Sequence, residues 1–335
     1  MKASRNTPTM AAVAAAAGVS QQTVSRVLNN HPSVSPKTSK NVHDAIAALG
    51  YRPNLAARAL ATGNTQTIGV LVSSTTLSGP SGALLGIERT ARADGYWVSM
   101  AGLQYGTASE VADVVSHFIR QGVDGIIAVA QTHIAVDATI EAVGAMPTVL
   151  VTSGKVPNGC RTVDTDQAGG VGQLMTILRG LGHTRIAHIS GPTGDIHAEV
   201  RAEAWRQALP EGVEPISFEG DWSSGAGYRG AMTLLASGQA PTAIFASNDR
   251  MAFGALRALY ERGIKVPHDM SVVGFDDIEG SDCSIPPLTT FNQDHAALGN
   301  VAVELLLEAM EGTPARSVKI PGQLIVRAST AVPRE

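Results

Sequence analysis

The sequence has few cysteines and few aromatic residues. Two cysteines occur in 335 residues, and phenylalanine, tryptophan and tyrosine together make up 4%. Cys160 and Cys283 form neither a disulfide framework nor a zinc-binding spacing, as expected for a protein of a reducing compartment. No apolar run reaches the roughly 20 residues that span a membrane. We therefore expect a cytoplasmic protein with no membrane partner, no metal and no cofactor.

One stretch near the N-terminus imitates a secretion signal. Lys2 and Arg5 precede an apolar run at residues 10–18, which is the order found in signal peptides. The run is almost all alanine, which is weakly hydrophobic and the best helix former. The polar segment 20–22 follows directly. We interpret this stretch as a helix of a soluble domain.

The charge is unevenly distributed along the chain. The formal net charge is −4, which taken alone argues against a nucleic-acid partner. Residues 1–64, however, contain seven basic and one acidic side chain, so they carry +6 and the rest of the chain carries −10. Binding to phosphates depends on this local charge. A small basic segment therefore precedes a large acidic body.

Three short helices are predicted within residues 9–50, and the second of them has two distinct faces. The residues that begin or end these helices are Thr9, Gly18, Ser20, Ser35, Pro36 and Gly50. In the second helix, at residues 21–28, the apolar side is formed by Val24, Val27 and Leu28. The third helix carries Val42, Ile46 and Leu49 on one side. Two helices joined by a glycine-containing turn are typical of a helix-turn-helix.

The polar side of the second helix suits a DNA groove. It presents Gln21, Gln22, Ser25 and Arg26. Glutamine can bond adenine through two atoms, and arginine can bond guanine O6 and N7. Lys37 and Thr38, at the start of the third helix, suit phosphates. An ordinary solvated helix face is the alternative interpretation.

From residue 67 onward, short apolar runs alternate with amphipathic segments. The apolar runs are residues 68–72, 97–103, 125–130, 148–152, 186–190, 243–246 and 271–275. The helix-like segments are residues 80–94, 107–121, 167–181, 196–209, 224–237, 249–262 and 294–311. This alternation predicts parallel sheets of buried strands. About 270 residues exceed one ordinary core, so two α/β lobes are expected.

Several long motifs resemble the lactose/galactose repressor (LacI/GalR) family of transcriptional regulators, in the family's order and over essentially the whole chain. The motifs are residues 18–30, 51–54, 57–60, 248–254, 271–277, 285–290 and 324–330. The resemblance implies a helix-turn-helix domain at 1–52, a hinge helix and linker at 53–65, and a ligand-binding core at 66–333. The core would resemble periplasmic binding proteins and consist of two doubly wound lobes. The first lobe would comprise residues 66–164 and 295–321, and the second 165–294 and 322–333.

By resemblance, the protein is a homodimer that represses sugar-utilisation genes and leaves a palindromic double-stranded operator when a sugar binds between its lobes. The implied DNA-binding residues are Thr9, Ser20, Gln21, Gln22, Ser25, Arg26, Asn29, Lys37, Thr38, Asn54, Ala57 and Leu60. Leu60 matches a leucine that wedges into the minor groove, where an apolar side chain kinks DNA. A plain packing leucine is the alternative. The chain has no apolar heptads at its C-terminal end, so we expect a dimer.

The implied ligand-binding residues are Arg201, Trp222, Asn248, Asp276, Gln293 and His295. Each has an alternative role. Arg201 could form a surface salt bridge, Trp222 could belong to the core, and Asn248 could cap a helix. Asp277 is interpreted as structural. The side chains suit hydroxyl groups, which favours a β-galactoside or related sugar and leaves a non-sugar effector as the alternative.

The sequence also departs from the family pattern. Residues 129–131 stand where some members end a strand with an asparagine, and residues 151–153 where they end one with an aspartate. His295 replaces an aromatic residue, and Ala12 replaces an aspartate. A sugar-transport protein and an enzyme are the competing classes. The chain lacks Gly-x-Gly-x-x-Gly after its first strand, a Walker loop, Gly-x-Ser-x-Gly and His-Glu-x-x-His, so no enzyme is indicated. His183, His188 and the closely spaced Asp164 and Asp166 are interpreted as structural.

Overall fold

The computed structural model describes residues 8–28, 31–52, 63–72, 78–103 and 106–334. The chain divides into two compact units, Met1–Thr65 and Gln66–Glu335. Within the described residues, no helix is long and apolar enough to cross a membrane.

The first unit is a bundle of three short helices around a small core. The helices are α1 (Met10–Ala17), α2 (Gln21–Leu28) and α3 (Pro36–Leu49). Its buried side chains are Val13, Ala14, Val24, Val27, Val42, Ala45 and Tyr51. The alanine-rich run is thus a helix, α1, that packs through Val13 and Ala14. Leu49, expected on the apolar side of α3, is instead 37% exposed, and Val42 and Ala45 are the buried residues of this helix.

The capping pattern predicted for this unit is confirmed. Thr9 accepts a hydrogen bond from the Ala12 amide, and Ser35 accepts one from the Thr38 amide. Gly18 and Gly50 end α1 and α3 in the left-handed conformation that glycine adopts without a steric penalty.

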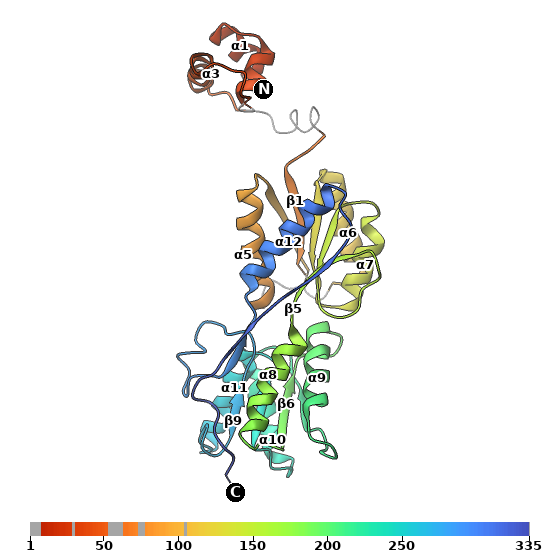
Figure 1. Ribbon diagram of the computed structural model, residues 1–335, viewed down its shortest axis with the longest axis vertical. Coiled ribbons are helices and arrows are strands. Elements are labelled where there is room, and N and C mark those ends of the chain that lie inside the picture. Colours follow the sequence, from red (N-terminus) through yellow and green to blue (C-terminus); the bar gives the residue numbers. More distant parts are fainter. Residues whose placement is uncertain (1–7, 29–30, 53–62, 73–77, 104–105, 335) are drawn as a thin grey trace, which may run out of the picture. The chain divides into compact units, whose positions relative to one another are not determined.

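The second unit contains a six-stranded sheet covered on both faces (Figure 1). Its strands are β1 (Thr67–Val72), β2 (Trp97–Gly102), β3 (Gly125–Val129), β4 (Thr148–Val151), β5 (Arg161–Thr165) and β11 (Ser317–Ile320), in the parallel order β11-β5-β4-β3-β1-β2. Helices α5 (Ser78–Ala93) and α12 (His295–Met310) pack on one face, and α6 (Ala108–Gln121) and α7 (His133–Val143) on the other. We call this sheet and its four helices the first lobe.

A four-stranded parallel sheet forms the centre of a second lobe. Its strands are β6 (Ile186–Ser190), β7 (Ser217–Glu219), β8 (Ala243–Ala246) and β9 (Ser271–Val273), in the order β7-β6-β8-β9. Helices α8 (Gln167–Gly180) and α9 (Ile196–Ala208) cover one face, and α10 (Ser224–Ala236) and α11 (Asp249–Glu261) the other. The antiparallel pair β10 (Thr290–Asn292) and β12 (Gln323–Ile325) packs beside α8.

The chain passes between the lobes three times. The crossings lie between β5 and α8, between β10 and α12, and between β11 and β12. Side chains tie two of the crossings together, since the Gln167 amide donates to Gln293 at 2.6 Å. Thr165 also donates to the Gln293 carbonyl at 3.3 Å.

The predicted fold class, a helix-turn-helix head followed by a core of two α/β lobes, is confirmed. One strand differs from the expectation of buried strands: β2 is an edge strand, with Trp97 65% and Met100 51% exposed. Helix α7 and strands β5, β7, β10, β11 and β12 were not predicted. The hinge helix and linker predicted at residues 53–65 fall mostly on residues 53–62, outside the described part of the chain.

Candidate functional site

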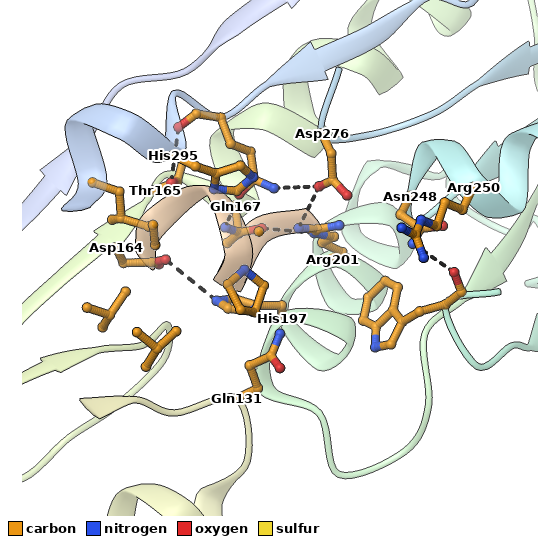
Figure 2. A pocket seen from close by; sticks show the side chains of 18 residues that line it. Gln131, Asp164, Thr165, Gln167, His197, Arg201, Asn248, Arg250, Asp276 and His295 are labelled. Atoms are coloured by element: carbon orange, nitrogen blue, oxygen red, sulfur yellow. Dashed lines mark hydrogen bonds and ion pairs between the residues drawn. The ribbon is translucent and has the colours of Figure 1, made fainter. Parts of the chain in front are cut away.

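A pocket lies where strands of both lobes end (Figure 2). Residues at or just after the carboxyl ends of β3, β4, β5, β8 and β9 line it: Val129, Gln131, Val151, Asp164, Thr165, Asn248 and Asp276. Ligands of open α/β sheets bind at this end of the strands. Side chains of both lobes line the pocket, as expected for a small-molecule site.

Arg201 lies buried in the second-lobe half of this pocket. It comes from α9 and is 4% exposed. Its Nε donates to Gln167 at 2.8 Å, Nη1 donates to the Ser247 carbonyl, and Nη2 lies 3.5 Å from an Asp276 oxygen. Burial lowers the pKa of the guanidinium, while Asp276 opposes that shift. The arginine is therefore held in one orientation by a set of acceptors.

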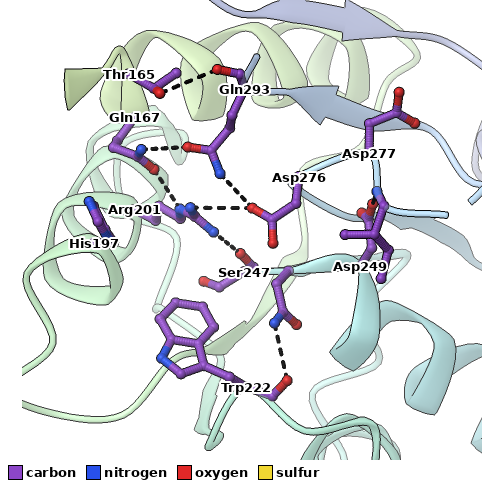
Figure 3. Close-up of polar contacts among 12 residues, drawn as sticks. Thr165, Gln167, His197, Arg201, Trp222, Ser247, Asp249, Asp276, Asp277 and Gln293 are labelled. Carbon is purple, nitrogen blue, oxygen red and sulfur yellow. Dashed lines mark hydrogen bonds and ion pairs between the residues drawn. The ribbon is translucent and has the colours of Figure 1, made fainter. Parts of the chain in front are cut away.

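Asp276 and Gln293 complete a polar network beside Arg201 (Figure 3). The Gln293 amide donates to Oδ1 of Asp276 at 2.5 Å, and the same oxygen faces Arg201. Within the described part of the chain, both of these side-chain contacts of Asp276 use Oδ1. A carboxylate oxygen with spare acceptor capacity and a fixed guanidinium can bind neighbouring hydroxyl groups of one ligand.

Trp222 and Asn248 form the neighbouring part of the pocket. Trp222 is 5% exposed and donates its indole N–H to Asp195 at 3.3 Å. Asn248 caps α11 by accepting from the Met251 amide at 2.8 Å, and its side chain donates to the Trp222 carbonyl at 3.1 Å. The asparagine thus fixes the tryptophan backbone as well as beginning a helix.

Two pocket residues adopt a backbone conformation that side chains disfavour. Trp222 has φ 67° and Asp276 has φ 112°. Non-glycine residues in these regions are strained and cluster at functional sites. Both of these strained residues belong to the pocket lining.

The first-lobe half of the pocket contains polar groups of a different kind. Asp164 of β5 accepts from the Ser153 hydroxyl at 2.6 Å and faces His197 of α9, with Nε2 3.7 Å from Oδ1. His295 begins α12 and lines the same pocket. Burial lowers the pKa of its imidazole.

The structure brings all six predicted ligand residues to this one pocket, although their binding to a ligand stays a prediction. The alternative of a surface salt bridge for Arg201 is wrong, because the side chain is buried. Trp222 serves both core and pocket, and Asn248 is both helix cap and pocket residue. Asp277 lies apart and pairs with Arg327 at 2.8 Å, as a structural residue would.

Sequence reasoning missed His197 and Gln167 as pocket residues and assigned Asp164 only a structural role. His197 precedes Arg201 by four residues, so the two lie on one side of α9. That spacing was the available signal for His197. Asp166, in contrast, caps α8 by accepting from the Gly169 amide.

In the first unit, α2 presents a polar face to solvent. Gln21, Gln22 and Arg26 are exposed and Ser25 is half-buried, while Val24 and Val27 are buried. Ser20 accepts from the Thr23 amide at the start of this helix. Lys37 is exposed and Thr38 half-buried at the start of α3. Asn29, Asn54, Ala57 and Leu60 lie outside the described residues, so their predicted DNA contacts stay predictions.

The fold and site define a class: helix-turn-helix proteins with a periplasmic-binding-protein-like core. Residues 9–54 match the family described as bacterial regulatory proteins, lacI family, and residues 176–330 match a periplasmic binding protein-like domain. The chain belongs to the LacI family of bacterial regulatory proteins.

Known proteins resemble this chain over nearly its whole length. The lactose operon repressor of Escherichia coli (strain K12) is 37% identical over 328 residues, covering 96% of this chain and 90% of the repressor. A crystal structure of the Lac repressor dimer bound to operator and the anti-inducer ONPF has a TM-score of 0.90 at 35% identity, covering 97% and 100% of the two chains. A complex of the transcriptional regulator CelR with cellobiose has a TM-score of 0.72 at 31% identity, covering 96% and 99%.

Proposed function

We propose that this protein is a ligand-responsive transcriptional repressor of sugar-utilisation genes. One observation carries the proposal: a basic helix-turn-helix unit and a pocket built around a buried arginine and a carboxylate occur in the same chain. A transport protein would need the pocket alone. An enzyme would likewise have no use for the basic helix-turn-helix unit.

The first unit supplies operator recognition. Gln21, Gln22 and Arg26 contact base edges in the major groove, and Lys37 and Thr38 contact phosphates. Residues 1–52 form this domain and residues 53–65 the hinge, in which Leu60 enters the minor groove. Two copies bind a pseudo-palindromic operator, as the Lac repressor dimer does with its own operator. The protein binds this operator in the cytoplasm.

The second unit supplies the response to a sugar. Arg201 donates to hydroxyl oxygens, Asp276 accepts from hydroxyls, and Trp222 covers the apolar face of the ring, with Asn248, Gln293 and His295 around it. The ligand is a β-galactoside or a related sugar. The protein binds and releases this sugar without a chemical reaction. The ligand binds one arrangement of the two lobes more tightly than the other and so shifts the equilibrium between them. The first lobe comprises residues 66–164 and 295–321, and the second lobe comprises residues 165–294 and 322–333.

The experiment that tests this function has two parts. DNA fragments selected in vitro by the full-length protein are expected to share a palindrome, and fluorescence anisotropy then measures affinity for it. A sugar from a screened panel is expected to raise the melting temperature and to weaken operator binding. If the selection enriches no palindrome, the proposed repressor function is refuted. If no sugar of the panel changes the melting temperature or operator binding, the proposed sugar effector is refuted.

A further inference from the structure

The start of helix α9, an element of the second lobe, packs into the first lobe. Ile196, the first residue of α9, is 3% exposed and belongs to a buried cluster whose other buried members all come from the first lobe, among them Ala130 and Val136. A Cβ added to Gly154, which follows β4, would lie 3.3 Å from Cγ2 of Ile196. A side chain of one lobe thus completes the hydrophobic core of the other.

Backbone contacts join the lobes at the same place. The Ile196 amide donates to the Gln131 carbonyl at 2.8 Å, and Asp195 forms an antiparallel bridge with Thr132. The first amides of a helix have no acceptor within the helix itself, so this donor finds its partner in the first lobe. We call the contacts that Asp195 and Ile196 make with the first lobe the seam.

The side chain of Asp195 connects the seam to the sugar pocket. It is 1% exposed. One carboxylate oxygen accepts from the Ala198 amide at 3.0 Å and so caps α9, and the other accepts from the Trp222 indole N–H at 3.3 Å. A single buried carboxylate therefore holds both the helix that carries Arg201 and the aromatic wall of the pocket.

The Trp222 ring has little room to choose another position. A Cβ added to Gly191, just after β6, would come within 2.3 Å of the ring, so the indole packs directly on the backbone there. The guanidinium carbon of Arg201 lies 5.6 Å from the ring centre on the pocket side. A buried indole N–H needs an acceptor, and Asp195 supplies it.

We propose that Asp195 and Ile196 are positioning residues that couple the sugar pocket to the contact between the lobes. This inference rests on the proposed sugar response. Neither side chain is among those that line the sugar pocket. Asp195 holds the Trp222 ring, and the seam holds Asp195. A sugar that packs on Trp222 therefore favours the docked seam, and the docked seam favours sugar binding by the same factor.

Ile196→Pro tests the bond between the lobes. Proline is accepted at the first position of a helix, and Asp195 has the extended backbone, with ψ 122°, that a following proline requires. The variant loses the amide that donates to Gln131. Ile196→Val keeps that amide and has the same number of side-chain carbon atoms as proline, so it is the matched control.

Isothermal titration calorimetry on the full-length protein compares the two variants. The probe is methyl β-D-galactoside or, where it does not bind, the tightest binder of the sugar panel. Ile196→Pro is expected to bind at least about fivefold more weakly than Ile196→Val, because only proline removes the bond between the lobes. Equal affinities would overturn the role of the seam. Asp195→Asn is the second variant if Ile196→Pro fails to fold.

Asp195→Asn tests the link to Trp222. Asparagine caps helices as well as aspartate does, but it has one oxygen where the carboxylate has two, so the indole loses its acceptor or the helix loses its cap. Without sugar, acrylamide quenching of tryptophan fluorescence is expected to increase, and the increase is expected to vanish in a Trp222→Phe background. Sugar affinity is expected to fall at least about fivefold, and to fall no further when Asp195→Asn is added to Trp222→Phe.

The outcomes separate this inference from the proposed function. Asp166→Asn makes the same substitution at the cap of α8 and is expected to change neither quenching nor affinity. An increase in quenching that persists in the Trp222→Phe background would overturn the positioning role of Asp195, whether or not a sugar binds. A panel in which no sugar binds the parent protein would overturn the sugar response together with the coupling, even if Asp195→Asn alters the tryptophan signal.

Discussion

The guanidinium carbon of Arg201 lies 3.9 Å from the centre of the Phe275 ring. The cation is thus held between an aromatic face and three acceptors: Gln167, the Ser247 carbonyl and Asp276. A planar guanidinium can stack and donate in several directions at once, whereas an ammonium cannot. The geometry is specific to arginine.

Arg201→Lys is therefore expected to abolish most ligand binding while preserving charge. We expect at least a tenfold loss of sugar affinity by calorimetry, with operator affinity unchanged. Arg206→Lys, on the same helix but exposed, is the matched control. Unaltered sugar affinity in Arg201→Lys would remove Arg201 from the ligand site.

Arg26 and Lys37 are expected to contribute to DNA binding in different ways. Arg26→Ala should weaken the free energy of binding to the selected operator by about 1–3 kcal/mol, because it removes a base contact. The variant should also discriminate less between DNA sequences. Lys37→Ala should weaken binding to all DNA sequences alike, because it removes a phosphate contact. The slope of log affinity against log salt concentration should become smaller in magnitude by about one. Anisotropy titrations at several salt concentrations distinguish them. The same profile for both variants would contradict the assignment.

His188 is expected to make the core sensitive to acid. The residue is 1% exposed, stacks on Phe245 with ring centres 4.9 Å apart, and bonds Ser247 at 2.7 Å. Burial lowers its pKa from 6.5 to about 3. Since the folded-state pKa is depressed, its contribution to stability is present above pH 6.5 and is lost as the pH falls toward 3. We expect about 2 kcal/mol of loss between pH 7 and 5 from this group.

His188→Phe should remove that acid-dependent loss. At pH 7 the variant should be less stable by about 1–3 kcal/mol, because Ser247 loses its partner. Urea unfolding at pH 7 and 5 measures both effects, with the exposed His268→Phe as control. A pH dependence equal to that of the parent protein would contradict this role.

Asp249 should change the pH dependence of stability in the direction opposite to His188, between pH 5 and 7. Its carboxylate accepts from Thr290, Ser281 and the Ile278 amide, yet burial raises its pKa from 3.8 to about 7. Because the folded-state pKa is raised, its contribution is present below pH 3.8 and is lost as the pH rises through 7. Between pH 5 and 7 we expect about 2 kcal/mol of loss. Asp249→Asn should abolish this loss, whereas Asp137→Asn on α7 should not.

Gly254 and Gly172 provide a matched pair for helix packing. A Cβ at Gly254 would lie 1.9 Å from the Ser224 carbonyl oxygen, whereas one at Gly172 meets nothing within 4 Å. Gly254→Ala should therefore cost about 1–3 kcal/mol by forcing α10 and α11 apart. Gly172→Ala should stabilise by about 0.5–1 kcal/mol through helix propensity. Thermal unfolding compares the two, and a stable Gly254→Ala would contradict the close contact.

The sequence predicted the elements with strong local signals. Most core strands are short apolar runs, and Thr9, Ser35 and Gly50 mark helix ends by their own chemistry. Strand β5 was missed because Arg161 and Asp164 interrupt its pattern. In the fold Arg161 is 7% exposed and bonds the carbonyls of Thr313 and Pro314, a long-range contact that no local pattern contains.

Site residues were predictable from the sequence only where the single residue could be matched to the family pattern. Asp276 stands in the matching motif at 271–277, and Arg201 was placed by resemblance four residues before Trp205. The Asp164–His197 pair joins β5 to α9 across the two lobes, so it depends on how the lobes close. Packing against α5 likewise buries both ring nitrogens of His295 without a hydrogen-bond partner in the described structure, which no spacing along the sequence reveals.

The three crossings between the lobes make each lobe a composite of distant chain segments. A protease that cuts one crossing releases neither lobe, because the other two crossings still join the lobes covalently. Separating the lobes requires three cuts. A nicked protein should therefore still hold its two halves together, so the loss of ligand response on proteolysis would report damage at the crossings rather than dissociation of the core.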